Sequence, residues 1–383
     1  MSTLSIVLPC TELRPRLRGM VAEILQSANQ DFEIVVFINS SDAPSDDQFF
    51  QGLNDSRLKV VYSKIFLNVA ESWTMATKAS SGNYVWLLGD DDFVLKEQLE
   101  SVITTLLKFQ PQCFTFNGAS YVFPSHLTSD LALGASSHFR ISKKYLGRIN
   151  LSERTKVVRN MFKFNPLVPL NLQLHIFSRE IFKLIGGKFE MPYPDHIAIT
   201  KFYFMSSSIL AVDKKLCFVG MSENSYGVSA YSNRVDVGSN YLGLAGLYEN
   251  PNSEVNILLY FMRIWLLELL KNPDFSHFRV SETNYELRQF SWVIRRILNK
   301  QANIANLWKY LTSLTSRKIF NIFFGLISPK NLSKIATTLT KPKGVSQLTG
   351  ARLTLTDHRT LEEYAKSMKS NLTQLGIEGH ETI

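Results

Sequence analysis

The chain has 383 residues, of which 45% are hydrophobic and 12% aromatic, so its composition is that of a folded globular protein and excludes an intrinsically disordered one. It is long enough for two domains, or for one large domain with an appendage. The net charge of +9 is a local property, because Leu287–Val345 contains eleven Lys or Arg residues and no Asp or Glu.

Neither a secretion signal nor a membrane span is expected. The apolar start at residues 4–10 is shorter than the usual signal sequence. Ile257–Leu270 has only fourteen residues and carries Arg263 and Glu268, so it is too short and too charged to cross a bilayer. Three separated cysteines in apolar surroundings predict reduced thiols of a cytoplasmic protein, with no zinc site and no disulfide; they are Cys10, Cys113 and Cys217.

The first hundred residues alternate between strand and helix signals. Short apolar, β-branched runs predict strands, and apolar residues at 3.6-residue spacing predict helices between them. This alternation predicts a mostly parallel sheet that is covered by helices on both faces. The expected strands are Leu4–Pro9, Phe32–Ile38, Leu58–Tyr62 and Tyr84–Leu88, the expected helices are Arg16–Ala28, Ala70–Ala79 and Lys96–Phe109, and Asn39–Asp47 is an expected turn.

The rest of the chain is less regular. Strands are expected at Gln112–Phe116 and Leu170–Phe177, a loop-rich stretch lies between them, and a helix starts near Asp195. Helical periodicity dominates from about residue 241 to about residue 339. The predicted fold class is therefore α/β with a C-terminal helical extension. The expected divisions are a catalytic domain at 1–235, a basic helical domain at 236–345 and a polar tail at 346–383.

Three consecutive aspartates come after the fourth predicted strand: Asp90, Asp91 and Asp92. In sheets of this kind ligands bind outside the carboxyl ends of the strands. Mg²⁺ and Mn²⁺ prefer oxygen ligands and often combine one or two carboxylates with phosphate and water. Asp90 and Asp92 suit such a site, while Asp91 would point away or cap the next helix. A solvated loop with a helix cap is the alternative.

Several motifs, read in order, resemble the family 2 glycosyltransferases. They are a strand ending in Leu8–Pro9, then "EIVVFINSSD", "LNVAESWTMATKASSGNYVWLLGDDD", "IFSREIFKLIGGKFE" and "YPDH". The resemblance covers roughly residues 3–230 and is nearest to bacterial transferases of O-antigen and other surface polysaccharides, abequosyltransferase-like members among them. It implies a GT-A fold, an Asp-x-Asp-type motif, a nucleotide-sugar donor, inversion at the anomeric carbon, and a Mn²⁺ or Mg²⁺ ion.

The resemblance also implies roles for matching residues. Asp90 and Asp92 would hold the metal against the diphosphate of the donor, where it stabilises the leaving group. Asp195 would be the base that takes the acceptor proton, with His196 as the other candidate; the alternative for Asp195 is a helix cap. Donor contacts are expected from Pro9, Thr11, Glu12, Asn39, Asp42, Asn68, Asp90 and Asp91.

The chain departs from the family pattern at the nucleotide pocket. The second strand ends in Asn39 rather than the usual aspartate, so Asn39 or Asp42 would have to hold the base. The usual "Y-N-R" after the first strand and the arginine near Asn68 are missing, and Trp73 is expected in a helix core. These differences point to an unusual donor or to altered base recognition. Met221–Asn233 is expected to be a lid over the donor or an ordinary surface loop.

Ile304–Leu326 has apolar residues at helical spacing with Lys and Arg around them. A basic amphipathic helix with Trp and Phe is typical of an anionic membrane interface. Packing on the catalytic domain, or on a second copy of the chain, is the alternative. Nucleic acid is not an expected partner, because no base-reading motif is present.

The sequence as a whole predicts a cytoplasmic glycosyltransferase at the inner face of the membrane. Its basic residues 287–345 would contact anionic lipid or form a homo-oligomer, and its acceptor would be a glycan, one that a polyprenyl diphosphate lipid could carry. Two alternatives stay open. One is a nucleotidyl- or phosphoryl-transferase with two metals, although no P-loop is present. The other is a non-catalytic scaffold with the same fold.

Overall fold

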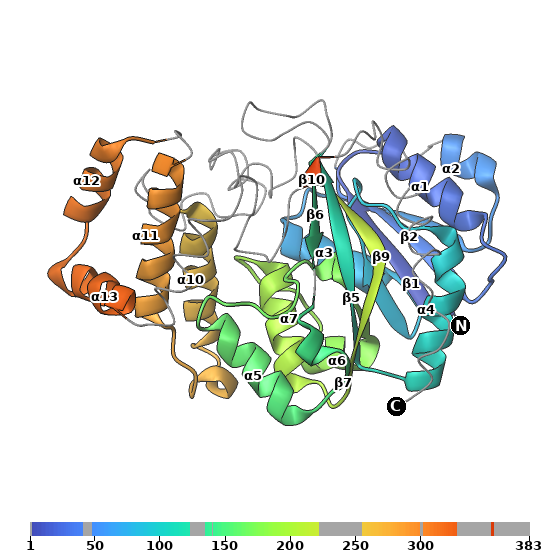
Figure 1. Cartoon of the computed structure of the whole chain (residues 1–383). Coiled ribbons are helices and arrows are strands. Elements are labelled where there is room, and N and C mark those ends of the chain that lie inside the picture. The colour runs from blue at the N-terminus through green and yellow to red at the C-terminus, as the bar shows by residue number, and fades with distance from the viewer. Residues whose placement is uncertain are drawn as a thin grey trace.

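The computed structural model describes residues 2–40, 48–122, 135–139, 141–221, 255–298, 302–327 and 354–355. In these ranges one ten-stranded sheet forms the centre, helices cover both of its faces, and a group of helices continues away from it (Figure 1). The α/β class and the helical C-terminal extension are thus confirmed. The domain boundary expected at residue 235 lies outside the described residues, as do Asp42 and most of the expected lid.

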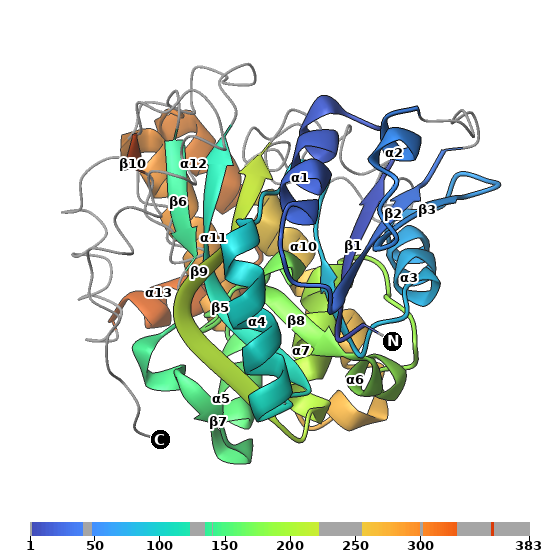
Figure 2. The same ribbon diagram turned by 90° about the vertical axis from the view of Figure 1, so that its right-hand side faces the viewer.

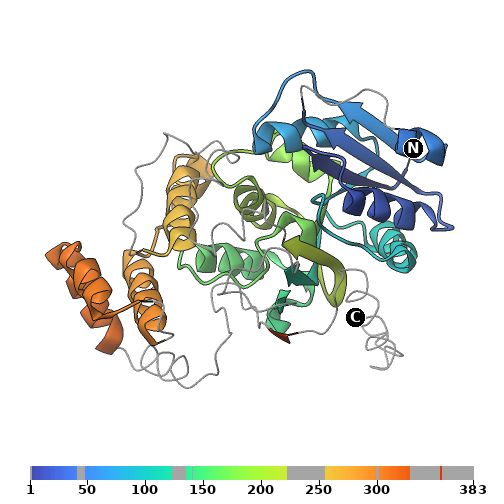
Figure 3. The ribbon, with the colours of Figure 1, turned by 90° about the horizontal axis from the view of Figure 1, so that it is seen from above.

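The first half of the sheet is parallel and was predicted. Its strands lie in the order β4-β1-β2-β3, so β1 pairs with both β2 and β4. Seen from above, α1 and α4 cover one face and α3 covers the other (Figure 3). The strands are β1 (Leu4–Cys10), β2 (Phe32–Ile38), β3 (Leu58–Tyr62) and β4 (Tyr84–Leu87), and the helices are α1 (Pro15–Leu25), α2 (Gln48–Leu53), α3 (Val69–Ala79) and α4 (Lys96–Phe109).

The second half of the sheet is mixed. β8 lies antiparallel between β4 and β5, and the long, curved β9 runs parallel to β5 (Figure 2). The elements are β5 (Cys113–Val122), β6 (Ala135–Phe139), β7 (Gly147–Ile149), α5 (Leu151–Met161), β8 (His175–Ser178), α6 (Arg179–Leu184), α7 (Pro194–Met205), β9 (Ile209–Met221) and β10 (Thr354–Leu355). Short 3₁₀ turns occur at Lys143–Tyr145, Leu172–Leu174 and Pro273–Phe275.

Several elements differ from the sequence predictions. The predicted strand at Gln112–Phe116 continues to Val122, and the strand predicted at Leu170–Phe177 begins only at His175. β9 was not predicted, because the polar "DKK" in its middle breaks the apolar run that usually marks a strand. α2 begins directly after the predicted turn, and the two-residue β10 pairs with β6 from within the predicted polar tail.

The C-terminal helices form two groups. α10 packs against α7 and contributes Trp265, which is fully buried in the main core. α11, α12 and α13 share a small core of their own around Val293, Tyr310 and Ile322. No helix in the described ranges has both the length and the apolar character needed to span a bilayer. The helices are α10 (Ile257–Leu269), α11 (Glu282–Leu298), α12 (Ile304–Thr312) and α13 (Ser316–Ile327).

A chain of buried hydrogen bonds lies where β5, β8 and α7 meet. The Tyr203 hydroxyl donates to Thr115 Oγ1 at 3.0 Å, and Thr115 Oγ1 lies 2.9 Å from His175 Nδ1. His175 Nε2 lies 3.0 Å from the carbonyl oxygen of Pro169, which can only accept. The proton is therefore on Nε2, and the Thr115 hydroxyl donates to Nδ1. Burial lowers the pKa of His175 to about 4, so the ring is neutral at pH 7.

Acidification should weaken the fold through His175. The imidazole is neutral in both states above pH 6.5, but between pH 6.5 and about 4 only the unfolded chain takes up the proton. This difference removes about 3 kcal/mol from the free energy of unfolding across that range. Urea unfolding at pH 7.5 and pH 4.5 should show a smaller difference for His175→Gln than for the wild type. His277→Asn, which changes an exposed histidine, is the control; an unchanged difference in His175→Gln would contradict the assignment.

Candidate active site

The three aspartates lie on the loop between β4 and α4, at the carboxyl edge of the parallel strands. This loop is attached to β9, because Phe93 and Phe218 exchange two backbone N–H···O hydrogen bonds of 2.9 Å each. The expected position of the aspartates at the rim of the sheet is therefore confirmed. The attachment to β9, which joins residues more than a hundred positions apart, carries no signal in the sequence.

Asp92 is the structural centre of this loop. Its side chain is only 3% exposed, and its two carboxylate oxygens accept from the backbone N–H groups of Gly89 at 2.5 Å and Gly220 at 3.1 Å. Gly220 must be a glycine, since a Cβ atom there would lie 1.7 Å from the carbonyl oxygen of Asp91. Asp92 thus joins the end of β4 to the end of β9 and fixes the position of its neighbours.

The electrostatics of the loop favour a bound cation. Burial raises the pKa of Asp92 well above its usual value, and the charge of Asp91 adds to the effect. Burial also raises the pKa of Asp90, although Arg14 opposes that shift. Clustered carboxylates with raised pKa values are poorly compensated, and a divalent cation would relieve their repulsion. These oxygen donors therefore fit Mg²⁺ or Mn²⁺.

A cation here would not be held by protein atoms alone. In the described ranges, no three His, Cys, Asp or Glu side chains come together as a complete cage for an ion. Asp90 is the more accessible ligand, with its side chain 22% exposed, whereas Asp92 is buried and uses both oxygens for backbone amides. Water and substrate phosphate commonly supply the remaining ligands of Mg²⁺ and Mn²⁺.

Arg14 lies beside Asp90 and was not among the expected site residues. Its Nη1 atom is 3.7 Å from Asp90 Oδ2, and its Nε atom donates to Glu12 Oε2 at 3.3 Å. The buried thiol of Cys10 lies close by, and burial together with the charge of Asp90 raises its pKa to about 12. Cys10 is thus an uncharged core thiol, and all three cysteines are buried and free.

Among the residues expected to contact the donor, Asn39 and Asn68 have structural partners. Asn39 is 2% exposed, and its amide group exchanges two 2.8 Å hydrogen bonds with the backbone of Leu67. Asn68 caps α3, since its Oδ1 accepts from Glu71 N at 3.0 Å. Their contacts to a donor stay predictions, as do those of three residues around the end of β1, namely Pro9, half-buried Thr11 and exposed Glu12. Trp73 packs edge-on against Phe189, as expected for a helix core.

The topology directs the first turn of α7, which carries Asp195, toward the edge of the sheet where the aspartates lie. α7 ends at Met205, four residues before β9 begins at Ile209 opposite Cys113, the first residue of β5. That start lies at the amino edge of the sheet, so α7 runs toward this edge and its first turn, with Asp195, lies toward the carboxyl edge. The sequence alone could not show this, because it gives no direction for the helix.

Asp195 and His196 form a pair at the start of α7. Asp195 Oδ1 accepts from the backbone N–H of His196 at 2.8 Å, and Asp195 Oδ2 lies 3.8 Å from His196 Nε2. Both side chains are about a quarter exposed. The imidazole stacks on Tyr193 at 5.0 Å and meets Trp265 of α10 edge-on at 5.5 Å. Burial lowers the pKa of His196, so the ring is neutral at pH 7.

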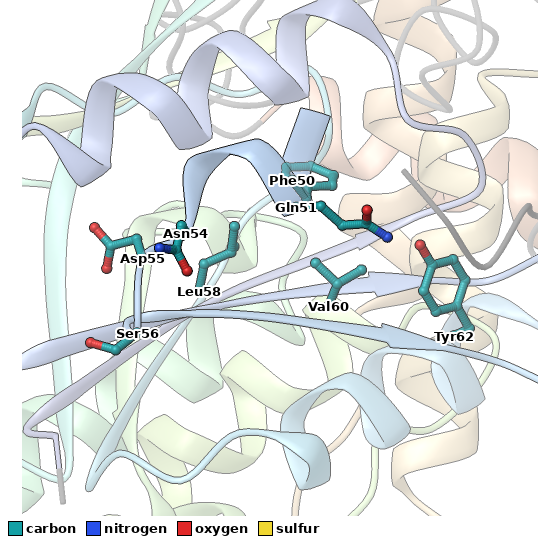
Figure 4. A pocket seen from close by; sticks show the side chains of 8 residues that line it. All are labelled: Phe50, Gln51, Asn54, Asp55, Ser56, Leu58, Val60 and Tyr62. Atoms are coloured by element: carbon teal, nitrogen blue, oxygen red, sulfur yellow. The ribbon is translucent and has the colours of Figure 1, made fainter. Parts of the chain in front are cut away.

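A pocket of about 480 Å³ lies elsewhere, between α2 and the edge strand β3 (Figure 4). β3 is separated from β4 by two strands, and none of the expected site residues lines this pocket. It is therefore not part of the candidate active site. Its lining consists of Phe50, Gln51, Asn54, Asp55, Ser56, Leu58, Val60 and Tyr62.

The family model described as "Glycosyl transferase family 2" matches residues 5–160, which include β1 to β4 and the aspartate loop. Among solved structures, the chain is similar to S. aureus TarS 1–349 in complex with UDP-GlcNAc, with 14% identity, a TM-score of 0.48, and coverage of 88% of this chain and 80% of that chain. It is also similar to the mannosyltransferase PcManGT from Pyrobaculum calidifontis in complex with GDP-Man and Mn2+, with 12% identity, a TM-score of 0.43, and coverage of 88% and 84%. No curated protein matches the sequence.

Gly220→Ala should destabilise the protein, because the new Cβ atom would lie 1.7 Å from the carbonyl oxygen of Asp91 and force β9 away from Asp92. We expect the free energy of unfolding to fall by about 1–3 kcal/mol in urea titration. Gly19→Ala in α1 is the matched control, since no atom lies within 4 Å of its added Cβ, and it should raise the free energy of unfolding by about 0.5–1 kcal/mol. Wild-type stability of Gly220→Ala would refute the close contact.

Proposed function

We propose that this chain, whose residues 5–160 match the model of glycosyltransferase family 2, belongs to that family and moves a sugar from a nucleotide-sugar to a glycan acceptor with inversion at the anomeric carbon. One observation carries the proposal. The aspartate loop lies at the carboxyl edge of the sheet, and the first turn of α7, which carries Asp195, lies toward the same edge. Asp90 and Asp92 hold the Mn²⁺ or Mg²⁺ ion, and Asp195 is the catalytic base.

The chain's own residues carry the chemical step. Asp195 accepts the proton of an acceptor hydroxyl while that oxygen forms a bond to the anomeric carbon. The bond from the same carbon to the diphosphate oxygen breaks on the opposite face, which inverts the configuration. When bound, the cation supplies positive charge to the departing diphosphate. The backbone N–H of His196 holds the Asp195 carboxylate, while stacking on Tyr193 and contact with Trp265 hold the neutral His196 ring beside it.

The acceptor belongs to bacterial surface polysaccharide synthesis, such as O-antigen, and is carried on a polyprenyl diphosphate lipid. Such an acceptor places the enzyme at the inner face of the cytoplasmic membrane. The exposed side chains of α12 and α13 support this location. Six large apolar residues there are 46–76% exposed, namely Ile304, Trp308, Ile319, Phe320, Phe323 and Ile327.

Cations accompany these apolar side chains. Lys309, Arg317 and Lys318 are exposed on the same two helices, and no acidic residue occurs from Leu287 to Val345. Each cation near an anionic surface contributes about 1 kcal/mol of attraction. We therefore assign α12 and α13 to contact with anionic lipid. A homo-oligomer that forms through the same helices is the alternative outcome of the test below.

Asp195→Asn, Asp90→Asn and Asp92→Asn should each abolish or strongly reduce turnover, with losses of about 10²–10⁴-fold for the base. The assay is metal-dependent hydrolysis of a nucleotide-sugar panel with Mn²⁺, followed by transfer to a lipid-linked glycan. Asp274→Asn, which changes an exposed aspartate in a 3₁₀ turn, is the control and should behave as the wild type. Binding of no donor by the wild type would favour the scaffold alternative.

Binding to vesicles should depend on the exposed apolar face. Trp308→Ser combined with Phe323→Ser should reduce flotation with vesicles that contain anionic lipid, and added salt should weaken wild-type binding because it screens the cations. Leu107→Ser combined with Leu184→Ser removes two residues of similar exposure from other helices and should leave flotation unchanged. Salt-independent binding, or a dimer that dissociates only in the first variant, would argue against lipid contact.

A further inference from the structure

The ion pair between Arg14 and Asp90 occupies an oxygen that the proposed function needs. Arg14 Nη1 lies 3.7 Å from Asp90 Oδ2, and both side chains are about one-fifth exposed. Asp90 is the more accessible of the two proposed metal ligands. A guanidinium group and a divalent cation repel each other and would compete for the same carboxylate.

Arg14 is well placed to leave Asp90 without leaving the site. Its Nε atom donates to Glu12 Oε2 at 3.3 Å, and Glu12 is largely exposed at 71%. The guanidinium is rigid and planar, so its nitrogen atoms move together, and the exposed Glu12 side chain can move with the group. Arg14 also directly precedes Pro15, the first residue of α1, which fixes the backbone there.

The charges give this movement a direction. Without a ligand, Asp90 is the anion that balances Arg14, and it raises the pKa of the guanidinium further although burial opposes this. A nucleoside diphosphate is a stronger partner, because arginine binds phosphate oxygens through paired, charge-assisted hydrogen bonds. A diphosphate at the rim would therefore attract Arg14 and leave Asp90 to the metal.

We propose that Arg14 couples the two ligands: it pairs with Asp90 in the empty enzyme and transfers to the diphosphate of the donor, which frees Asp90 for the cation. This inference rests on the proposed function. It makes Arg14 a donor-binding and positioning residue supplied by the first loop of the fold. Cation and nucleotide should consequently bind with positive cooperativity, each strengthening the other by the same factor.

The test measures binding, so it does not depend on turnover. Free Mn²⁺ is followed by electron paramagnetic resonance in titrations without nucleotide and with saturating UDP, GDP, CDP or dTDP, and nucleotide affinity is measured by calorimetry. In the wild type, the nucleotide that binds should tighten Mn²⁺ binding. In Arg14→Gln, Mn²⁺ alone should bind about 2–5-fold more tightly because its competitor is gone, whereas the nucleotide should bind about 10-fold more weakly.

The matched control is Arg159→Gln, which removes an exposed arginine from α5 and should keep wild-type values. Circular dichroism and thermal melting check that Arg14→Gln is folded. Wild-type Mn²⁺ and nucleotide affinities in folded Arg14→Gln would overturn the coupling and leave the proposed function intact. Failure of the wild type to bind Mn²⁺ or any nucleotide would overturn both.

Discussion

The candidate site depends on one buried carboxylate. Asp92 accepts backbone hydrogen bonds from Gly89 and Gly220, and these bonds hold the end of β4 against the end of β9. A buried anion is costly unless hydrogen bonds or a nearby cation compensate it. The same group therefore fixes the geometry of the loop and creates a local excess of negative charge. That excess is the physical reason for expecting a positive partner at this edge of the sheet.

Two kinds of positive partner would act on different aspartates at this edge. Arg14 is part of the protein and pairs with the more exposed Asp90. A divalent ion would also act on Asp92, the buried carboxylate of the loop. Asp195 belongs to another environment, beside His196, whose neutral imidazole contacts two aromatic rings. The acidic loop, which would bind a cation, is thus separate from the carboxylate of Asp195. This separation suits a reaction in which one group withdraws electrons and another accepts a proton.

The C-terminal helices connect to this site and also present a surface of their own. Through Trp265, α10 reaches the ring of His196, so the helical extension supports the residue next to the candidate base. The apolar stripe predicted over Ile304–Leu326 divides between two uses. Leu307, Leu311 and Leu314 pack on the small core shared with α11, whereas Trp308 and Phe323 face outward. The apolar residues of the stripe lie on helices as predicted, but only some of them pack the helices against one another.

The sequence by itself determined the parallel half of the sheet, the helices α1, α3 and α4, and the position of the aspartates. Those elements are local: apolar runs and helical spacing are visible within ten to fifteen residues, and residues directly after a strand must lie at its end. Its ordered motifs also resembled those of the family 2 glycosyltransferases, and the model of that family matches residues 5–160. Capping side chains such as Asn68 were ambiguous, because one polar residue can cap a helix or bind a ligand with the same atoms.

Only the tertiary structure decided which distant residues meet. β9, interrupted by charged residues in its sequence, gains its pairing from β5, and its Gly220 reaches Asp92 across 128 positions. The contact of Arg14 with Asp90 likewise joins two loops that come after different strands. Such contacts arise when strands align side by side and bring their ends to one edge. No pattern along a single segment predicts these contacts, because the interactions that stabilise them form only when the strands pack into the sheet.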